Sequence, residues 1–375
     1  MVNQERLVQE FMELVQVDSE TRNEQEISQV LKKKFAEYGL TVTEDNAQEK
    51  TGFGANNLFA SLAATSDKEL PRLFFTCHMD TVTPGKGIKP RVDEDGYIRS
   101  DGTTILGADD KAGIAAMFET IRVLKENNIP HGKIQFVISV GEESGLIGAR
   151  AMDASYMDAD FGYALDSNGA VGGIAVAAPT QVRLYVDIRG KSAHAGVNPE
   201  DGISAIQVAS KAVSRMNLGR LDKDTTANIG KFAGGDQTNI VCDYVRVEAE
   251  ARSLYQEKVD KQVGHMKEAF ESAASDFGAT VDIKTELLYP AFNYGDDAPV
   301  VQLAMRALET IGKTPNTFQT GGGSDANMFN GMGIPTVNLA VGYEHIHTTK
   351  EQILVSELVD TARAVVAIVQ EVAKG

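Results

Sequence analysis

Apolar runs and helical repeats of apolar residues alternate along the first half of the chain. The N-terminal segment carries Leu7, Phe11 and Leu14 at helical spacing, which predicts an amphipathic helix. Four short apolar runs predict strands, and one longer segment predicts a helix between the second and third of them: strands Leu58–Leu62, Leu73–Cys77, Ile134–Val140 and Tyr163–Leu165, and helix Lys111–Glu126. Alternating strands and helices are typical of an α/β layer with a largely parallel sheet.

The pattern changes near residue 180, where Val182, Leu184 and Val186 alternate with polar neighbours and predict a half-buried strand. The expected elements that follow are a helix near 202–216, strands at 238–241 and 244–251, a helix near 258–275 and a strand near 280–285. This β-α-β-β-α-β order is typical of a small two-layer, ferredoxin-like domain.

After Pro290 the α/β pattern resumes, with an expected helix over 298–311, a strand at Thr336–Ala340 and a terminal amphipathic helix. The chain is therefore expected to form one α/β domain that is interrupted by a smaller one. The predicted boundaries are 1–179 and 290–375 for the α/β domain and 180–289 for the insertion.

Charge and cysteine content narrow the possible partners and location. The chain has 53 acidic and 36 basic residues, a net charge of −17 that should repel nucleic acid and anionic membranes. Neither is therefore expected as a partner. Cys77 and Cys242 lie far apart and form no CxxC pattern, and the N-terminus lacks the features of a signal peptide. A cytoplasmic protein with reduced thiols is expected.

Polar side chains follow the ends of several predicted strands, which is where open α/β sheets place their sites. His78 and Asp80 come directly after the strand Leu73–Cys77. Residues two apart in a strand share a face, so Asp80 can reach the ring N–H of His78. Asp109 and Asp110 lie between glycines before the predicted helix. Alone, the pair of His78 and Asp80 is better explained as part of a polar turn, and the pair of Asp109 and Asp110 fits a helix N-terminus as well as it fits a functional site.

Further acidic and imidazole groups follow later strands. Glu142 and Glu143 are adjacent carboxylates that repel each other unless a cation or proton lies between them. Asp166 follows another strand, and His347 lies beyond the strand Thr336–Ala340. Singly these are also compatible with solvated turns, but together two imidazoles and three carboxylates can hold two divalent ions with one carboxylate bridging. Such two-metal sites hydrolyse amides and phosphoesters.

Other site motifs are missing from the sequence. There is no HExxH pair and no phosphate loop of the GxxxxGK[ST] type. The glycine-rich run at 320–325 lacks the lysine of such a loop, and the segment around Asp93 fails the register of a calcium loop and is expected to be a hairpin turn.

In combination the motifs resemble the co-catalytic di-zinc peptidase family. This family contains peptidase T (tripeptide aminopeptidase), glutamate carboxypeptidases, aminoacylases and succinyl-diaminopimelate desuccinylase. The resemblance spans nearly the whole chain and is closest to the peptidase T branch in the run SDGTTILGADDKAGIA. The motifs are HMDT at 78, GADDKAG at 107, GEESG at 141, ALDSNG at 164, GKSAHAGVNPEDGISAI at 190, GGDQTNIV at 234, GGGSDAN at 321 and HTTKE at 347.

The resemblance implies a zinc-exopeptidase-like α/β catalytic domain with an inserted lid or dimerisation domain, and a role for several residues. The implied ligands of two divalent ions, with Asp109 as the bridge, are His78, Asp109, Glu143, Asp166 and His347. His347 is preferred to His345 because the family's histidine lies four residues before a glutamate; His345 is expected nearby or on the substrate side. Glu142 is implied as general base and Asp80 as the residue that orients His78. The Asp109–Asp110 peptide bond is expected to be cis.

In the inserted domain, His194 matches a residue that reaches a neighbouring active site and stabilises the tetrahedral intermediate, which implies a homodimer. Asn239 and Arg252 match positions that hold the substrate's carboxylate or main chain. From the residues alone, two alternatives to substrate binding stay open. Asn239 could cap a turn, and Arg252 could form one half of a salt bridge within the inserted domain.

The function implied by the resemblance is a metal-dependent exopeptidase that hydrolyses small peptides, expected to be a tripeptide aminopeptidase. Zinc is the expected metal, with cobalt and manganese as alternatives. A di-zinc carboxypeptidase or an N-acyl amino-acid amidohydrolase would use the same metal residues and stays open. A non-catalytic relative that binds a ligand is more remote.

Overall fold

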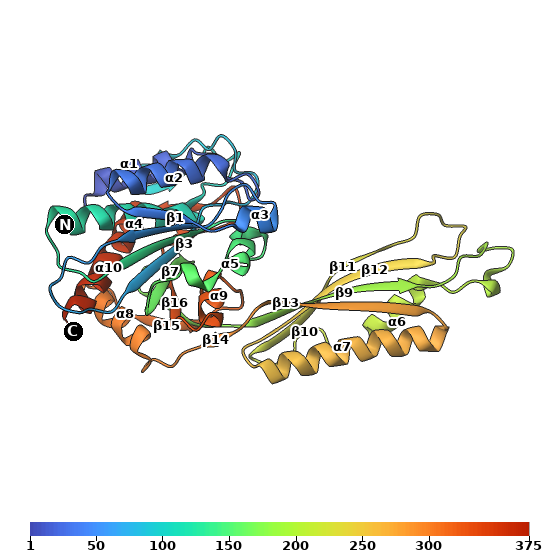
Figure 1. The fold of residues 1–375 in the computed structure, drawn as a ribbon. Helices are drawn as coiled ribbons and strands as arrows, with labels where there is room; N and C mark the ends of the chain where they lie inside the picture. The colour runs from blue at the N-terminus through green and yellow to red at the C-terminus, as the bar shows by residue number, and fades with distance from the viewer. Residues whose placement is uncertain (375) are drawn as a thin grey trace. The chain divides into compact units, whose positions relative to one another are not determined.

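The computed structural model describes residues 1–374, and the chain divides into two compact units. The larger unit comprises Met1–Ala177 and Asn293–Gly375, and the inserted unit is Ala178–Phe292 (Figure 1). The boundaries proposed from the sequence, 180–289, lie inside the inserted unit. None of the helices within residues 1–374 has the length and apolar character needed to span a bilayer.

The larger unit is built on a mixed sheet with the strand order β1-β2-β6-β3-β7-β16-β8-β14, in which β15 also pairs with β8. Its strands are β1 (Thr41–Glu44), β2 (Leu58–Leu62), β3 (Leu73–His78), β6 (Ile134–Ser139), β7 (Phe161–Ser167), β8 (Gly173–Ala178), β14 (Phe292–Asn293), β15 (Asn316–Gln319) and β16 (Thr336–Ala340). The central strands β6, β3, β7 and β16 are parallel, whereas β1, β2 and β8 introduce antiparallel pairs. The expectation of an α/β layer is confirmed, but the sheet is mixed and not largely parallel, because apolar runs do not encode strand direction.

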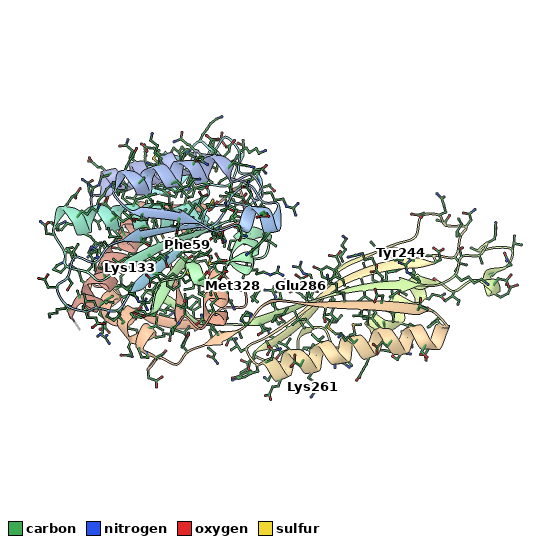
Figure 2. The ribbon with its side chains drawn as sticks, viewed as in Figure 1. Phe59, Lys133, Tyr244, Lys261, Glu286 and Met328 are labelled. Atoms are coloured by element: carbon green, nitrogen blue, oxygen red, sulfur yellow. The ribbon has the colours of Figure 1, made fainter. Side chains whose placement is uncertain are left out.

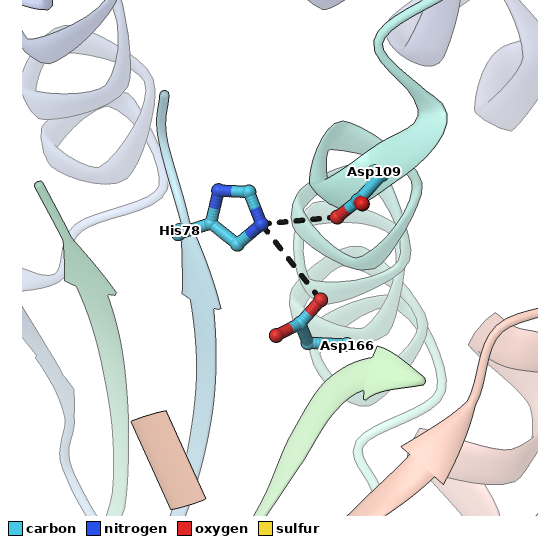
Figure 3. Close-up of side chains that lie close together, drawn as sticks. All are labelled: His78, Asp109 and Asp166. Atoms are coloured by element: carbon cyan, nitrogen blue, oxygen red, sulfur yellow. Dashed lines mark hydrogen bonds and ion pairs between the residues drawn. The ribbon is translucent and has the colours of Figure 1, made fainter. Parts of the chain in front are cut away.

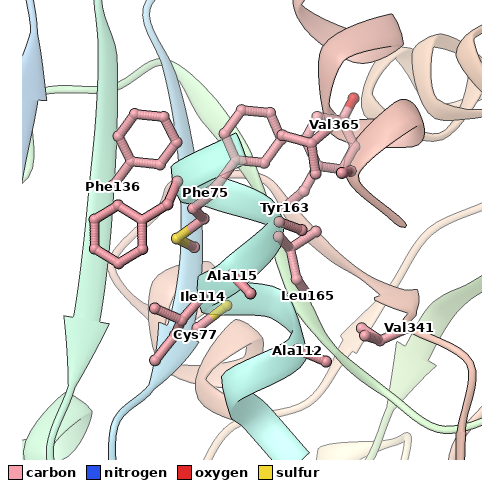
Figure 4. Close-up of a cluster of buried hydrophobic side chains, with 14 of the residues drawn as sticks. Phe75, Cys77, Ala112, Ile114, Ala115, Phe136, Tyr163, Leu165, Val341 and Val365 are labelled. Carbon is pink, nitrogen blue, oxygen red and sulfur yellow. The ribbon is translucent and has the colours of Figure 1, made fainter. Parts of the chain in front are cut away.

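Helices cover both faces of this sheet. The helices of the larger unit are α1 (Gln4–Val15), α2 (Gln25–Glu37), α3 (Ala47–Thr51), α4 (Ala108–Glu126), α5 (Ile147–Ala151), α8 (Pro299–Thr310), α9 (Asp325–Gly331) and α10 (Val355–Lys374). Phe75 and Tyr163 of β3 and β7 pack beneath α4, in the cluster that includes Ala112 and Ala115 (Figure 4). The preceding residue on β3, Phe74, points to the opposite face and packs on Phe329 of α9. This alternation is the period-2 pattern of a strand buried on both sides.

A small second sheet joins distant segments beside the main one. Its order is β17-β18-β5-β4, with β4 (Arg91–Val92), β5 (Tyr97–Arg99), β17 (Tyr343–Glu344) and β18 (Gln352–Leu354). The hairpin expected around Asp93 joins β4 and β5. Ile353 of β18 pairs with Ile98 of β5, which brings the turn between β17 and β18 close to the segment that leads into α4.

The inserted unit has a five-stranded antiparallel sheet with the order β10-β11-β12-β9-β13. Its elements are β9 (Thr180–Arg189), α6 (Ala205–Ser214), β10 (Gly219–Arg220), β11 (Thr225–Gly234), β12 (Tyr244–Ser253), α7 (Gln256–Phe277) and β13 (Thr280–Tyr289). Apolar residues of β9 and β12 pack against α6 and α7 in one cluster. Tyr244 of β12 lies on the other face of the sheet, and Lys261 lies on the exposed side of α7 (Figure 2).

The strand expected at 238–241 is wrong. Within that run only Ile240 makes a bridge, to His194, and the strand that pairs with β12 is β11, at 225–234. Most of β11 beyond Ala227 is exposed and carries two glycines. A strand without a buried face has no alternation of apolar and polar residues, so the pattern could not reveal it.

Candidate metal centre

The candidate metal ligands lie at one edge of the main sheet. His78 ends β3, Asp166 lies near the end of β7, and Glu143 lies in a short 3₁₀ turn, η1 (Glu142–Ser144), just after β6. These strands are parallel, so their carboxyl ends meet at the same edge. Asp109 comes from the start of α4 and His347 from the turn between β17 and β18. The structure thus brings together all five residues proposed as ligands.

The carboxylate of Asp109 lies between two imidazoles. Its Oδ1 is 3.0 Å from Nε2 of His78, and its Oδ2 is 3.2 Å from Nε2 of His347. On one side, Asp166 Oδ1 lies 3.7 Å from the same nitrogen of His78 (Figure 3). On the other side, Glu143 Oε1 lies 3.0 Å from His347 Nε2. The result is two triads that share Asp109, and within each triad the ligand atoms lie within 4.8 Å of one another.

Electrostatics in this cluster favour added positive charge. Burial lowers the pKa of His78, but hydrogen bonds to carboxylates, Asp109 first, outweigh burial and raise it well above its ordinary value. Hydrogen bonds with Asp109 and Glu143 raise the pKa of His347 to about 10. Burial works to raise the pKa of Asp109, but the two imidazoles hold it well below its ordinary value. The positive charge of the protonated imidazoles therefore neutralises part of the negative charge of the buried carboxylates, and bound metal cations could supply that positive charge instead.

The donor set fits two divalent ions. Imidazole nitrogen and carboxylate oxygen are ligands that zinc accepts, and the two triads are each small enough to surround one ion. Asp109 belongs to both triads, so its carboxylate could hold both ions of a two-metal site. The side chain of His78 is 1% exposed and that of His347 is 49% exposed, so the His347 side of the cluster is the one open to solvent.

The backbone before Asp109 is irregular. Gly107 has a left-handed φ of +77°, a conformation that glycine adopts without steric cost. Asp109 and Asp110 have non-helical φ and ψ angles, and the peptide bond between them is cis, which confirms the expectation from the sequence. The side chain of Asp110 turns away from the ligands and accepts the backbone N–H of His78 at 3.2 Å.

Asp80 contacts more than His78. Nδ1 of His78 lies 2.9 Å from the backbone carbonyl oxygen of Asp80 and 3.4 Å from its carboxylate. The two carboxylate oxygens accept the backbone N–H groups of Glu142 and Glu143 at 2.9 and 3.2 Å. Asp80 is fully buried, and its carboxylate therefore holds the η1 turn as well as facing the imidazole.

Glu142 begins the η1 turn, and its carboxylate takes part in neither ligand triad. Burial, and then the charge of nearby Asp166, raise the pKa of Glu142 well above its ordinary value. A carboxyl group with a raised pKa beside a metal site is suited to accept and return a proton near neutral pH.

Three residues at the site were not singled out by the sequence. The hydroxyl of buried Tyr343 donates to Asp166 at 3.1 Å, and no sequence signal marked it. Burial raises the pKa of Asp325 to about 7, and Ser139 donates to this carboxylate. Glu351 accepts the backbone N–H groups of Asp109, Gly107 and Leu106. The GGGSDAN and HTTKE motifs contain Asp325 and Glu351, so the signal was present without an assigned role.

The remaining candidates lie outside the two triads. His345 is exposed, and the metal-ligand groups found among residues 1–374 include His347 but not His345. In the inserted unit, His194 and Asn239 are exposed on adjoining loops, since the backbone carbonyl of Asn239 accepts the N–H of Ala195. Nδ1 of His194 accepts two backbone N–H groups at 3.1 Å, which leaves Nε2 to carry the ring proton.

Arg252 is half-buried and forms an ion pair with Glu250 at 2.9 Å. Its guanidinium also lies 3.4 Å from the hydroxyl of Tyr289. Arg252 therefore forms the salt bridge within the inserted domain that the sequence left open as an alternative to substrate binding.

Comparison with known proteins gives a consistent set of matches. Residues 74–371 match the family described as Peptidase family M20/M25/M40. The crystal structure of aminopeptidase PepT from Bacillus cereus ATCC 10987 is 61% identical, with a TM-score of 0.93 over 99% of both chains. That of a tripeptidase from Staphylococcus aureus subsp. aureus mu50 is 51% identical, with a TM-score of 0.96 over 100% of both chains. The uncharacterized protein YqjE of Bacillus subtilis (strain 168) is 59% identical over 374 residues, which cover 100% of both chains.

Proposed function

The chain belongs to peptidase family M20/M25/M40, and from this premise we propose that it is a two-metal exopeptidase that acts as a tripeptide aminopeptidase. The resemblance to the di-zinc peptidase family seen in the motifs is thereby confirmed, as is the expected α/β fold. The names of two relatives that are more than half identical, an aminopeptidase PepT and a tripeptidase, support peptides with a free amino end as substrates.

One observation carries the proposal: the carboxylate of Asp109 faces His78 with one oxygen and His347 with the other. A carboxylate in this position can bridge two ions, with Asp166 completing one triad and Glu143 the other. We propose zinc at both positions, because all five ligands are imidazoles or carboxylates. Two such ions supply the Lewis acidity that makes water nucleophilic near neutral pH and polarises the scissile carbonyl.

The chain's own residues then complete the hydrolysis. Glu142 takes a proton from the attacking water, and the C–N bond breaks as the same carboxyl group returns that proton to the leaving amine. Asp80 keeps Glu142 in place through the backbone hydrogen bond at 2.9 Å. Tyr343 fixes the carboxylate of Asp166 by donating to one of its oxygens.

We further propose that His194 stabilises the developing oxyanion at the active site of a second subunit. The support is its exposed side chain, whose Nδ1 is fixed as an acceptor, so that Nε2–H remains free to donate to an oxyanion. This role requires a homodimer through the inserted unit, with Asn239 and Arg252 as contacts for the peptide backbone or carboxylate. Mixing the inactive His194→Ala and Glu142→Gln variants tests whether His194 acts in the neighbouring subunit. Recovery of activity in the mixture supports this role, and a mixture that stays inactive contradicts it.

The deciding experiment uses one tripeptide in two forms, with a free and with an N-acetylated amino end. Metal-stripped protein is assayed with and without added Zn²⁺, and the released amino acids are identified. Zinc-dependent release of the N-terminal residue from the free form only is the expected result. Co²⁺ and Mn²⁺ added in parallel compare the candidate metals.

The other outcomes of this experiment define the competing functions. Cleavage of the acetylated peptide would indicate a carboxypeptidase or an N-acyl amino-acid amidohydrolase with the same metal residues. Cleavage of neither form, with two metals bound, would contradict a tripeptide substrate. Absence of bound metal in protein incubated with Zn²⁺ would contradict the two-metal site itself.

A further inference from the structure

The carboxylate of Glu351 collects three backbone N–H groups from the segment that carries Asp109. Its Oε2 accepts from Leu106 and Gly107, each at 2.8 Å, and its Oε1 accepts from Asp109 at 3.0 Å. Glu351 is 2% exposed, and residues 106–109 are also buried. The buried side chain of Glu351 thus binds the backbone of residues 106–109, although Glu351 lies 242 residues beyond Asp109 in the chain.

These N–H groups need an acceptor from outside their own segment. Residues 106–109 precede the regular part of α4, and the left-handed Gly107 and the non-helical Asp109 interrupt its helical geometry. The N–H groups at a helix start have no partner within the helix, and buried N–H groups without a partner are costly. The two oxygens of Glu351 accept all three and so hold this irregular backbone in one conformation.

The same glutamate also closes the turn that carries His347. The backbone N–H of Glu351 donates to the carbonyl of Thr348 at 3.1 Å, and β18 begins at the next residue. The Asp109 carboxylate in turn lies 3.2 Å from His347. These contacts link the three residues in a ring. Glu351 binds the backbone of Asp109, the Asp109 carboxylate contacts His347, and the chain from His347 leads back to Glu351.

We propose that Glu351 is a positioning residue that sets the distance between Asp109 and His347 and so governs the metal position on the His347 side. This inference rests on the two-metal site proposed above. His78 and Asp166 lie on paired strands of the main sheet, which hold them without help from Glu351. His347 lies in a turn, has a positive φ of 61°, and is half exposed. Weakening the hydrogen bonds of Glu351 therefore affects the metal site beside His347 and Glu143 more than the metal site beside His78 and Asp166.

The test compares Zn²⁺ binding to metal-stripped wild-type protein and to Glu351→Gln, by calorimetric titration and by equilibrium dialysis. The glutamine keeps the length of the side chain but replaces one acceptor oxygen by an N–H₂ group that faces backbone N–H. The Zn²⁺ beside His347 and Glu143 is expected to bind about 10–100-fold more weakly, the range found when a partner of a metal ligand is removed. The affinity of the Zn²⁺ beside His78 and Asp166 is expected to change much less.

Two further variants locate the effect. Glu344→Gln removes a carboxylate that bonds Tyr97 and Gln352, and it is expected to bind two ions like the wild type. In a His347→Ala background, adding Glu351→Gln should change the affinity of the remaining ion less than ~3-fold. Equal weakening of both ions, or unchanged binding, would overturn the proposal.

Folding is checked on the same samples by circular dichroism. If Glu351→Gln does not fold, Glu351→Asp is used, because it keeps the charge but withdraws both oxygens by one methylene. Failure of both variants to fold would make Glu351 a residue of the fold and would also overturn the positioning role. Wild-type protein that binds fewer than two ions would contradict the proposed two-metal site instead, so the two failures are distinguishable.

Discussion

The carboxylate of Asp80 accepts the backbone N–H of Glu142 at 2.9 Å. Asp80 follows β3 and Glu142 follows β6, two strands that are neighbours in the main sheet. The hydrogen bond therefore fixes the residue proposed as general base relative to the strand that ends in His78. Because Asp80 is fully buried, salt screens this hydrogen bond less than it would an exposed one.

Asp80→Asn is expected to reduce kcat about 10–100-fold while two zinc ions remain bound, because an amide can serve only one of the two N–H groups that Asp80 accepts. Steady-state kinetics and metal analysis of the same preparation measure both effects. The matched control is Asp153→Asn, which alters an exposed cap on a remote 3₁₀ turn and should leave kcat unchanged. An unchanged kcat in Asp80→Asn would show that the bond does not position the base.

Glu142→Gln is expected to lower turnover about 10²–10⁴-fold, the usual contribution of a general base, without loss of either metal. The reason is that the Glu142 carboxylate belongs to neither ligand triad. Its neighbour supplies the control, because Glu143→Gln removes a proposed ligand and should lower the metal content. Loss of metal from the Glu142 variant would mean that the two glutamates exchange roles.

The two histidines of the HIHTTKE segment are expected to differ sharply. His347→Ala should reduce the bound zinc from two ions to one, because His347 faces both Asp109 and Glu143. His345→Ala should keep both ions, since His345 is exposed and belongs to no ligand group among residues 1–374. Metal analysis after exhaustive dialysis distinguishes the variants, and retention of two ions in His347→Ala would contradict the assignment.

Zinc binding is expected to release protons and to strengthen as the pH rises. In metal-free protein the pKa of His347 is raised to about 10 and that of His78 lies well above its ordinary value. Both imidazoles are therefore protonated at pH 7, and a metal ligand must be deprotonated. The ion pairs of His347 stabilise the metal-free fold below pH 6.5, and this contribution disappears as the pH rises through about 10.

Calorimetry in two buffers of different ionisation enthalpy counts the protons released in the zinc titration. A release that does not fall as the starting pH approaches 10 would contradict the raised pKa of His347. His345→Ala serves as the matched control and should release as many protons as the wild type.

Gly113→Ala is expected to destabilise the protein by about 1–3 kcal/mol through overpacking. A Cβ at Gly113 would lie 2.5 Å from Cys77 Sγ and 2.8 Å from the carbonyl oxygen of Leu165, where α4 crosses β3 and β7. Gly264→Ala on α7 is the control: its Cβ would meet nothing within 4 Å, so the helix should gain about 0.5–1 kcal/mol. Denaturant unfolding of both variants measures the difference, and similar effects would contradict close packing at Gly113.

The sequence by itself determined the elements with a buried apolar face and the residues that could bind metal. The strand Leu58–Leu62 was predicted with its observed ends, because all of its residues except Ser61 are apolar and buried. His78, Asp109, Glu143, Asp166 and His347 were identifiable because several strand ends carry imidazoles or carboxylates together, and the family resemblance assigned these five as the ligands. The exposed strand β11 was not predicted, because its residues show no sustained alternation of apolar and polar positions and do not record which neighbour it pairs with.

Only the tertiary structure decided how these residues act on one another. Sequence spacing suggested that Asp80 orients His78, and its carboxylate does lie 3.4 Å from Nδ1 of that imidazole. The same carboxylate also accepts the backbone N–H groups of Glu142 and Glu143, which follow the adjacent strand. Tyr343 and Glu351 reach Asp166 and the Asp109 segment from almost two hundred residues or more along the chain. A hydrogen bond over such a separation depends on sheet order and on the pairing of β18 with β5, which local patterns of residues do not encode.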